Sequence, residues 1–363
     1  MQPKPLHILI SPLDWGLGHA SRCIPVINQL IKSGHKVTMA GFGRSFILLQ
    51  KEFPHLERIE LTGFSPSYSK TGNMAWHMLL LLPRFISSVF CEHRDLKRLI
   101  ARNDFDIIIS DNRYGLWNKK ITSILITHQV MVKTPAWLQF AEYPVYRLSR
   151  LLISRFDECW IPDYSESPGL SGDLSHKYPL PPNARFIGPL SRFTEDETIS
   201  ETDVAEGRIT AIISGPEPQR SIFEDLVAGQ LAGLNEPATL LSGRPERENN
   251  IAAIGKLTIL PHLSTREMRL LIKSSLLVIC RSGYSSIMDL HALGAKALFV
   301  PTPGQTEQIY LAELHHKQGT SFWKKQEMLS LKADRADALK YPGFKYTLSG
   351  LNVSAAIADL KKK

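Results

Sequence analysis

A chain of 363 residues is longer than one hydrophobic core usually supports, so its length predicts two domains. With 43% hydrophobic and 21% charged residues and no short repeat, the composition excludes a disordered or fibrous protein. The net charge of +8 lies mainly in residues 1–190, which hold 22 lysines and arginines against 15 acidic residues. This half lacks a zinc-finger spacing, an aromatic RNA-binding motif and a basic block. An anionic substrate or membrane surface is therefore favoured over nucleic acid.

The cysteines and the N-terminal sequence predict a cytoplasmic protein. The cysteines are scattered without a CxxC pair, which disfavours zinc or a redox switch and indicates buried thiols in a reducing compartment; they are Cys23, Cys91, Cys159 and Cys280. The N-terminus runs directly into a predicted strand without the apolar core of a signal peptide.

Short apolar runs rich in Ile, Val and Leu recur along the chain, with helical patterns between them. Such near-continuous runs are typical of parallel strands buried on both faces. The predicted strands are residues 6–10, 35–40, 105–110, 123–127, 158–163, 209–214, 238–242, 257–260, 276–280 and 297–301.

The polar, acidic segment 191–208 divides these strands into two sets and is predicted to be an interdomain linker. We therefore expect two Rossmann-like, doubly wound α/β domains, residues 1–190 and 209–340, that face a cleft. Residues 341–363 are expected to end in an amphipathic helix whose last lysines complement the helix dipole.

The first predicted strand leads into the loop SPLDWGLGHASR, residues 11–22. Gly16 and Gly18 allow the backbone to approach a ligand, and the following helix N-terminus favours an anionic group. The third glycine of the dinucleotide fingerprint is missing, and no acidic residue closes the next strand. A dinucleotide-dependent oxidoreductase is therefore disfavoured.

His19 in this loop has two interpretations. It either caps the helix and packs against the strand, or it accepts a proton from a hydroxyl group near neutral pH. Asp14 and Arg22 either orient the ring or bind the ligand, or they are surface charges.

The longest apolar stretch of the first half, residues 74–90, is interrupted by His77, Pro83 and Arg84. It is too short to span a bilayer, although it can lie on one. Residues 145–156 alternate leucine and isoleucine with three arginines, Arg147, Arg150 and Arg155. This segment is either an interfacial helix or a core-facing helix with snorkelling arginines.

The second half opens with a strand, the loop GPEPQR (residues 215–220) and a helix. This loop is either an ordinary turn or a phosphate-facing loop that carries Arg220 across the cleft from the first loop.

Residues 276–314 contain a strand, a small-residue turn, a helix, a second strand, a proline-rich loop and another helix. The turn predicts an anion site of backbone N–H and hydroxyl groups at the first helix start; its residues are Ser282, Gly283, Ser285 and Ser286.

The same segment carries side chains suited to sugar hydroxyls. Asp289, one turn into the first helix, can accept hydrogen bonds from a ribose. The second loop presents amide and carboxylate groups that can read a donor sugar, or that simply face solvent; they are Gln305, Glu307 and Gln308.

These motifs resemble the GT-B glycosyltransferases of the MurG-like type, with a second domain of the glycosyltransferase family 28 C-terminal-domain type, and more widely the UDP-glycosyltransferases. The MurG-like enzymes transfer N-acetylglucosamine to the lipid-linked peptidoglycan precursor. The resemblance is strongest over residues 255–314, where CRSG at 280–283 is the closest literal match. In the first half it depends on GLGHASR at 16–22 and THQ at 127–129.

The resemblance implies positions for the donor. Leu263 would contact the nucleobase through its main chain, and Asp289 would contact the ribose. Ser282 and Gly283 would lie beside the diphosphate, and Gln308 beside the donor sugar. Arg281 is included in this donor-binding set.

The first-domain motifs are implied to serve the acceptor. His19 would bind the acceptor or act as the base, with His128 and Gln129 nearby. The chain departs from the family at two places, GPEPQR in place of a glycine-rich loop and Ile309 in place of one of two paired glutamines.

We therefore expect an inverting, metal-independent transferase that moves a hexose or N-acetylhexosamine from a UDP-sugar to a hydroxyl acceptor. The helix end and Arg220 would stabilise the departing diphosphate, and no metal or other cofactor is expected. The basic first half and its apolar segments favour a lipid-linked acceptor, a role in the cell envelope and peripheral contact with the inner face of the cytoplasmic membrane.

Two alternatives remain open on the sequence. GLGHASR also matches the GxGHxxR pattern of UDP-sugar hydrolases from pseudaminic acid synthesis, in which the histidine would activate water. A non-catalytic sugar-nucleotide-binding subunit would result if the GPEPQR loop did not hold phosphate.

Overall fold

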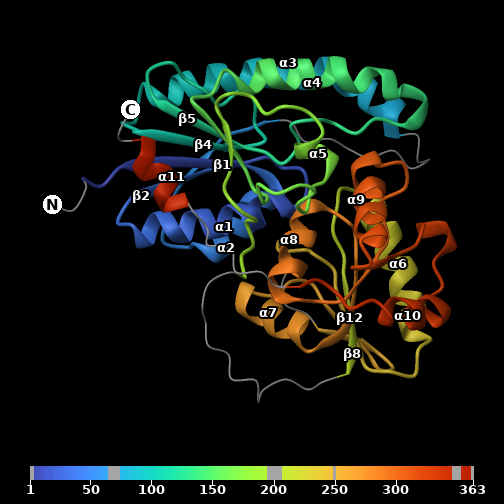
Figure 1. Cartoon of the computed structure of the whole chain (residues 1–363). Coiled ribbons are helices and arrows are strands. Elements are labelled where there is room, and N and C mark those ends of the chain that lie inside the picture. Colours follow the sequence, from blue (N-terminus) through green and yellow to red (C-terminus); the bar gives the residue numbers. More distant parts are fainter. Residues whose placement is uncertain (1–3, 64–73, 194–206, 248–250, 346–352, 361–363) are drawn as a thin grey trace.

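The chain folds into two α/β domains, whose arrangement is shown by a computed structural model (Figure 1). The structure describes residues 4–63, 74–193, 207–247, 251–345 and 353–360. Each domain contains one parallel-dominated sheet with helices on both faces, so the predicted fold class is confirmed.

The first domain is built on a seven-stranded, entirely parallel sheet in the order β3-β2-β1-β4-β5-β6-β7. The strands are β1 (His7–Pro12), β2 (Lys36–Gly41), β3 (Glu57–Glu60), β4 (Ile107–Asp111), β5 (Thr122–Ile126), β6 (Glu158–Ile161) and β7 (Ala184–Phe186). Its helices are α1 (Leu17–Lys32), α2 (Gly43–Glu52), α3 (Met74–Ile100), α4 (Glu142–Ile153) and α5 (Asp173–His176), with the 3₁₀ helix η1 (Ala136–Ala141).

The second domain repeats this winding in the order β10-β11-β9-β8-β12-β13-β14, with only the edge strand β10 antiparallel. Its strands are β8 (Arg208–Ile212), β9 (Ala238–Leu241), β10 (Ala252–Ile254), β11 (Leu257–Leu260), β12 (Ser275–Cys280), β13 (Ala297–Phe299) and β14 (Phe322–Trp323). Its helices are α6 (Gln219–Ala232), α7 (Thr265–Lys273), α8 (Tyr284–Leu293), α9 (Thr306–Lys317) and α10 (Leu331–Leu339), with the 3₁₀ helix η3 (Gln326–Met328).

The central strands are buried because helices cover both faces of each sheet. Every residue of β4, β6 and β9 is buried, and these strands are the apolar runs that the sequence displays. In both sheets the strands that follow the first strand lie first on one side of it and then on the other. This change of side falls between β1 and β4 in the first sheet and between β8 and β12 in the second. Ligands of open α/β sheets bind in the crevice at such a switch point.

The last described helix, α11 (Val353–Leu360), returns to the first domain and lies near α1 (Figure 1). Val353, Ala356 and Ile357 are buried in the apolar core there, and Arg185 donates to the carbonyl of Ala356 at 2.8 Å. The predicted terminal lysines lie outside the described residues, as do residues 194–206 of the predicted linker.

The predicted apolar stretch 74–90 forms the first part of α3. Among the described residues, no helix has the length and hydropathy required to cross a bilayer.

Candidate active site

The loop after β1 brings the first domain into direct contact with the second. Gly16 has φ 86° and precedes α1, so the chain turns sharply into the helix that carries His19. Ser285, at the start of α8, donates to the carbonyl oxygen of Gly18 at 2.9 Å. A Cβ atom on Gly18 would lie 3.0 Å from this hydroxyl oxygen. The glycine therefore permits close approach of the two domains.

His19 is oriented by a carboxylate that the sequence analysis missed. Its Nδ1 lies 2.8 Å from Oδ1 of Asp111, the fully buried last residue of β4. The imidazole retains 14% exposure. Burial opposes ionisation of Asp111, but the charges of Arg22 and His19 outweigh it and lower its pKa to about 2. The sequence signal for Asp111 is its place as an acidic residue directly after the predicted strand 105–110.

Arg22 is a buried part of this site rather than a surface charge, since only 1% of it is exposed. Its Nε and Nη2 both donate to the carboxylate of Asp111, and Nη2 also lies 2.9 Å from Nδ1 of His19. Its Nη1 lies 3.1 Å from Nδ1 of His128. Arg22 therefore links the predicted base to the second histidine motif.

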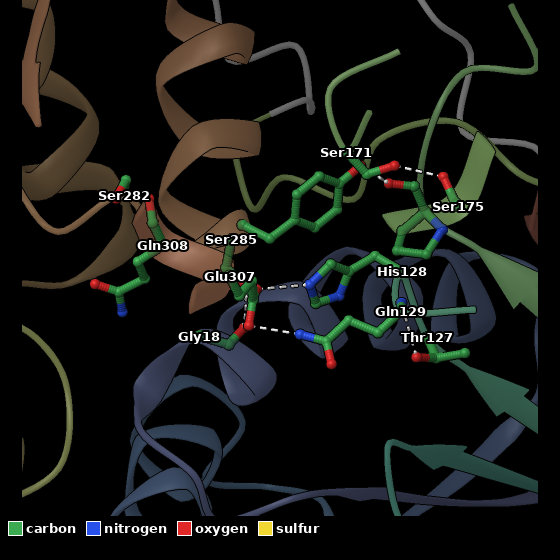
Figure 2. Close-up of polar contacts among 12 residues, drawn as sticks. Gly18, Thr127, His128, Gln129, Ser171, Ser175, Ser282, Ser285, Glu307 and Gln308 are labelled. Carbon is green, nitrogen blue, oxygen red and sulfur yellow. Dashed lines mark hydrogen bonds and ion pairs between the residues drawn. The ribbon is translucent and has the colours of Figure 1, made fainter. Parts of the chain in front are cut away.

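His128 follows β5 and is held between the domains (Figure 2). Its Nε2 lies 2.9 Å from Oε1 of Glu307 in α9, and its ring stacks on Tyr284 with centroids 4.2 Å apart and planes 6° apart. Gln129 donates to the other oxygen of Glu307. Burial lowers the pKa of His128, which keeps the ring neutral at neutral pH.

Glu307 was predicted to read sugar hydroxyls, yet both of its oxygens bond to the first domain in this structure. Burial opposes its ionisation, but the hydrogen bond and charge of His128 lower its pKa overall. The neighbouring Gln308 accepts from the Thr302 N–H at 2.8 Å through its side chain, and its carbonyl accepts from Ser282 at 2.7 Å. Gln305 precedes α9 as its N-cap residue.

The start of α8 lies over the first-domain loop, with Gly283 as its N-cap residue. The hydroxyls of Ser282 and Ser285 are directed to carbonyl oxygens. The anion-binding capacity of this end therefore comes from its backbone N–H groups and the helix dipole.

The predicted ribose contact, Asp289, lies in a small cavity of about 80 Å³ that Arg192 and His262 also line. Its carboxylate accepts from Ser191 at 2.7 Å and lies 3.5 Å from Arg192. Burial raises the pKa of Asp289. Leu263 follows His262 and packs, partly buried, against the apolar core.

The two arginines predicted to bind the donor are engaged within the second domain. Arg220 bonds to Glu217, Glu224 and the Ser242 carbonyl. Arg281 donates to the carbonyls of Val300 and Pro301 and to Gln326, and it lies 3.9 Å from the ring centroid of Phe223. Arg281, which follows β12, therefore connects the end of that strand to the residues after β13. It lines neither the cavity at Asp289 nor the larger cavity between the domains.

A larger cavity of about 260 Å³ opens between the domains. The first domain contributes the loop after β1 and the start of α2, and the second contributes the loops after β8 and β9. Its lining residues are Asp14, Gly16, Leu17, Arg44, Ser214, Gly215, Pro216, Glu217, Arg220 and Gly243. Asp14 also accepts from the Ser45 N–H at 3.1 Å and so supports the start of α2.

Within the ranges that the structure describes, no group of three or more His, Cys, Asp and Glu side chains is arranged to hold a metal ion.

The second domain matches a known family over part of its length, since residues 249–335 match the glycosyltransferase family 28 C-terminal domain. Two uncharacterized glycosyltransferases of the archaeon Methanosarcina acetivorans are similar along most of the chain. One is 23% identical over 86% of this chain and 84% of its own length. The other is 26% identical over 84% of this chain and 79% of its own length.

Solved glycosyltransferases share the whole fold. Spinosyn rhamnosyltransferase SpnG, in complex with thymidine diphosphate, superposes with a TM-score of 0.61 at 15% identity, over 97% of this chain and 95% of the enzyme. Acinetobacter baumannii MurG superposes with a TM-score of 0.51 at 13% identity, over 99% of this chain and 100% of the enzyme.

The fold defines the class of protein as GT-B. The resemblance to glycosyltransferases with a family 28-type second domain is confirmed, and the comparisons support a transferase enzyme of that class.

Proposed function

We propose that this protein is an inverting, metal-independent glycosyltransferase that moves a sugar from a nucleotide sugar to a hydroxyl acceptor, with His19 as the base. The observation that carries the proposal is the His19–Asp111 pair, which lies directly after the contact of Gly18 with Ser285 at the start of α8, where the two Rossmann-like domains meet. Structural neighbours described as complexes with thymidine diphosphate and with UDP-L-rhamnose support a nucleotide-sugar donor.

The geometry supports a direct displacement. Nδ1 of His19 lies near an acceptor, Oδ1 of Asp111 at 2.8 Å, and near a donor, Nη2 of Arg22 at 2.9 Å. When Nδ1 carries the ring proton and donates it to Asp111, the lone pair at Nε2 can accept the proton of an acceptor hydroxyl. The acceptor oxygen forms a bond to the anomeric carbon while the bond from that carbon to the diphosphate oxygen breaks. A single displacement inverts the anomeric configuration.

The leaving diphosphate gains negative charge as this bond breaks. The N-terminus of α8 directs backbone N–H groups and the positive end of the helix dipole toward the domain interface, so it can stabilise that charge without reorganising. Arg220 borders the larger cavity, but Glu217 and Glu224 offset its charge. We therefore assign the main stabilisation to the helix end.

We further propose that the acceptor is lipid-linked and that the protein contacts the inner face of the cytoplasmic membrane. Helices α3 and α4 lie along the outer side of the first domain (Figure 1). Together with η1 they expose large apolar side chains, which are Phe90, Trp137, Phe140, Leu148 and Leu151. Exposed Arg147 and Arg150 of α4 lie among them, whereas Tyr146, Ser149 and Ile153 face inward. This arrangement supports the interfacial interpretation of residues 145–156.

Product analysis tests the proposed activity. The purified protein is incubated with UDP- and TDP-sugars, with and without a membrane lipid extract as acceptor, and the products are separated by mass. Sugar transferred to a lipid acceptor with release of nucleoside diphosphate is expected. Free sugar in equal yield without acceptor would favour the hydrolase, and nucleotide binding without turnover of any donor would favour the binding subunit.

A further inference from the structure

A continuous set of buried polar contacts joins the proposed base to the second domain. His19 contacts Asp111 and Arg22, Arg22 contacts His128, and His128 contacts Glu307 of α9. Four of these residues belong to the first domain and only Glu307 to the second. Nothing in the proposed chemistry requires a carboxylate at the far end of this set.

The protonation of His128 follows from its neighbours. Arg22 has only N–H donors, so Nδ1 of His128 must accept from Nη1 of Arg22. The proton of the neutral ring is then on Nε2, where it donates to Oε1 of Glu307. Arg22 and Glu307 therefore favour the same tautomer, Arg22 as the donor to Nδ1 and Glu307 as the acceptor from Nε2.

The contact between His128 and Glu307 depends on the position of the two domains relative to each other. Glu307 and the stacked ring of Tyr284 are both second-domain groups, and they hold His128 on two sides. Thr306 also donates to the Lys133 carbonyl at 2.6 Å, which anchors the start of α9 to the loop after β5. Separation of the domains would remove the Nε2 acceptor and the stacked ring together.

We propose that Glu307 is a positioning residue, which fixes the tautomer of His128 when the domains close and thereby orients Arg22, Asp111 and His19 for proton transfer. The part of this inference that concerns catalysis rests on the proposed function. Without Glu307, the proton of His128 can move to Nδ1, where it opposes the N–H groups of Arg22. Arg22 then shifts, and the Asp111–His19 contact loses its support.

The first test is spectroscopic and needs no turnover. Selective ¹⁵N-histidine labelling reports tautomers through long-range ¹H–¹⁵N correlations, and the His128→Asn variant assigns the His128 signals. We expect the Nε2–H tautomer in the full-length wild-type chain and its loss in Glu307→Leu, which has no acceptor for this N–H, with a shift of the His19 signals. Glu313→Leu, on another face of α9, is the matched control. Equal His19 and His128 spectra in Glu307→Leu and the control would overturn the proposal.

Two replacements of His128 then separate its two contacts. An asparagine can place a carbonyl oxygen near Nδ1 and retain the acceptor for Arg22, whereas a glutamine can place an amide N–H near Nε2 and retain the donor to Glu307. Asn should therefore tolerate removal of the Glu307 carboxylate: in the His128→Asn background, Glu307→Leu should cause no further loss of kcat. A full additional loss in the double variant would contradict coupling through His128.

Kinetics distinguish positioning from donor contact. One general base typically contributes 10²–10⁴-fold to a rate, so a disturbed base should lower kcat by about 10-fold in Glu307→Leu. The dissociation constant of the nucleotide should remain within about 2-fold. A raised KM for the donor with unchanged kcat would overturn the proposal in favour of a sugar contact. Absence of turnover in the wild type would refute the proposed function, while the tautomer comparison would still decide the coupling.

Discussion

At the scale of single residues, the site depends on the groups that replace the lost hydration of the buried Asp111 carboxylate. A carboxylate with no exposed surface is stable only when ionic and hydrogen-bond partners replace its lost hydration. Arg22 and His19 supply those partners, and both come from the helix that the first glycine loop introduces. The same contacts that stabilise this charge orient the proposed base.

Replacement of His19 by alanine should remove the base without disturbing the donor side. We expect kcat for transfer to fall by about 10²–10⁴-fold. Nucleotide affinity, measured by calorimetry, should change little. Unchanged turnover would contradict the role of His19, and Ser33→Ala at the far end of α1 provides the control.

The lowered pKa of Asp111 predicts a defined loss of stability in acid. Because its folded-state pKa of about 2 lies below the ordinary aspartate value of 3.8, the stabilisation is complete above about pH 5 and is lost progressively as the pH falls through 2. This difference corresponds to about 2 kcal/mol of unfolding free energy.

Urea unfolding between pH 2 and 6 measures this contribution in the wild type and in Asp111→Asn. The difference in unfolding free energy between the wild type and Asp111→Asn should decrease as the pH falls from 6 to 2. Parallel curves would show that Asp111 is not the titrating group. Asp337→Asn, an exposed position on α10, is the control.

At the scale of elements, the contact between α1 and α8 sets the distance between the domains. Gly18→Ala would place a methyl group 3.0 Å from the Ser285 oxygen and 3.1 Å from its Cβ. Such overpacking typically costs about 1–3 kcal/mol. We expect a lower melting temperature and a lower kcat in this variant.

A compensating change tests whether this contact is the cause. Ser285→Gly removes both atoms that the new methyl group would meet, so the double variant should recover part of the kcat lost in Gly18→Ala. No recovery of kcat would locate the effect elsewhere. The single variant Ser285→Gly is the reference, because it measures how much stability and kcat are lost when glycine replaces serine at the start of α8.

The outer face of α4 predicts membrane binding. Exposed Leu148 and Leu151 have no role in the core, so Leu148→Ser with Leu151→Ser should leave the melting temperature unchanged while reducing flotation with anionic vesicles. Leu339→Ser, on α10 of the second domain, is the matched control. Equal flotation of the double variant and the wild type would refute the proposed membrane surface.

At the scale of the whole molecule, closure brings together groups that lie far apart in the chain. Tyr284 and Glu307 contact His128, and Arg44 of α2 donates to the carbonyl of Gly243 and lies 3.1 Å from Glu246. The chain also returns from the second domain to the first at α11, where Arg185 donates to the carbonyl of Ala356. These contacts make the described structure a closed arrangement.

Ligand binding should stabilise this closed arrangement. A nucleoside diphosphate present at 100 times its Kd should add about 2.7 kcal/mol to the unfolding free energy. We expect UDP or TDP to raise the melting temperature of the wild type and of His19→Ala alike, measured by calorimetry. A rise confined to the wild type would place His19 in nucleotide binding.

The sequence by itself determined which segments form the two sheets, because parallel strands that are buried on both faces are near-continuous apolar runs. Ten strands were expected and observed in this way. The four that were missed, β3, β7, β10 and β14, are short, carry no fully buried residue and are defined by pairing with a neighbour.

The tertiary structure alone decided how the candidate residues are connected. His19, His128 and Glu307 were recognised in three separate motifs, but no local pattern showed that Arg22 and Asp111 lie between them. The hydrogen bonds between these side chains depend on distances of about 3 Å, and His128 and Glu307 are 179 positions apart in the chain. Such distances are set by the packing of two domains and leave no periodic signal in the sequence.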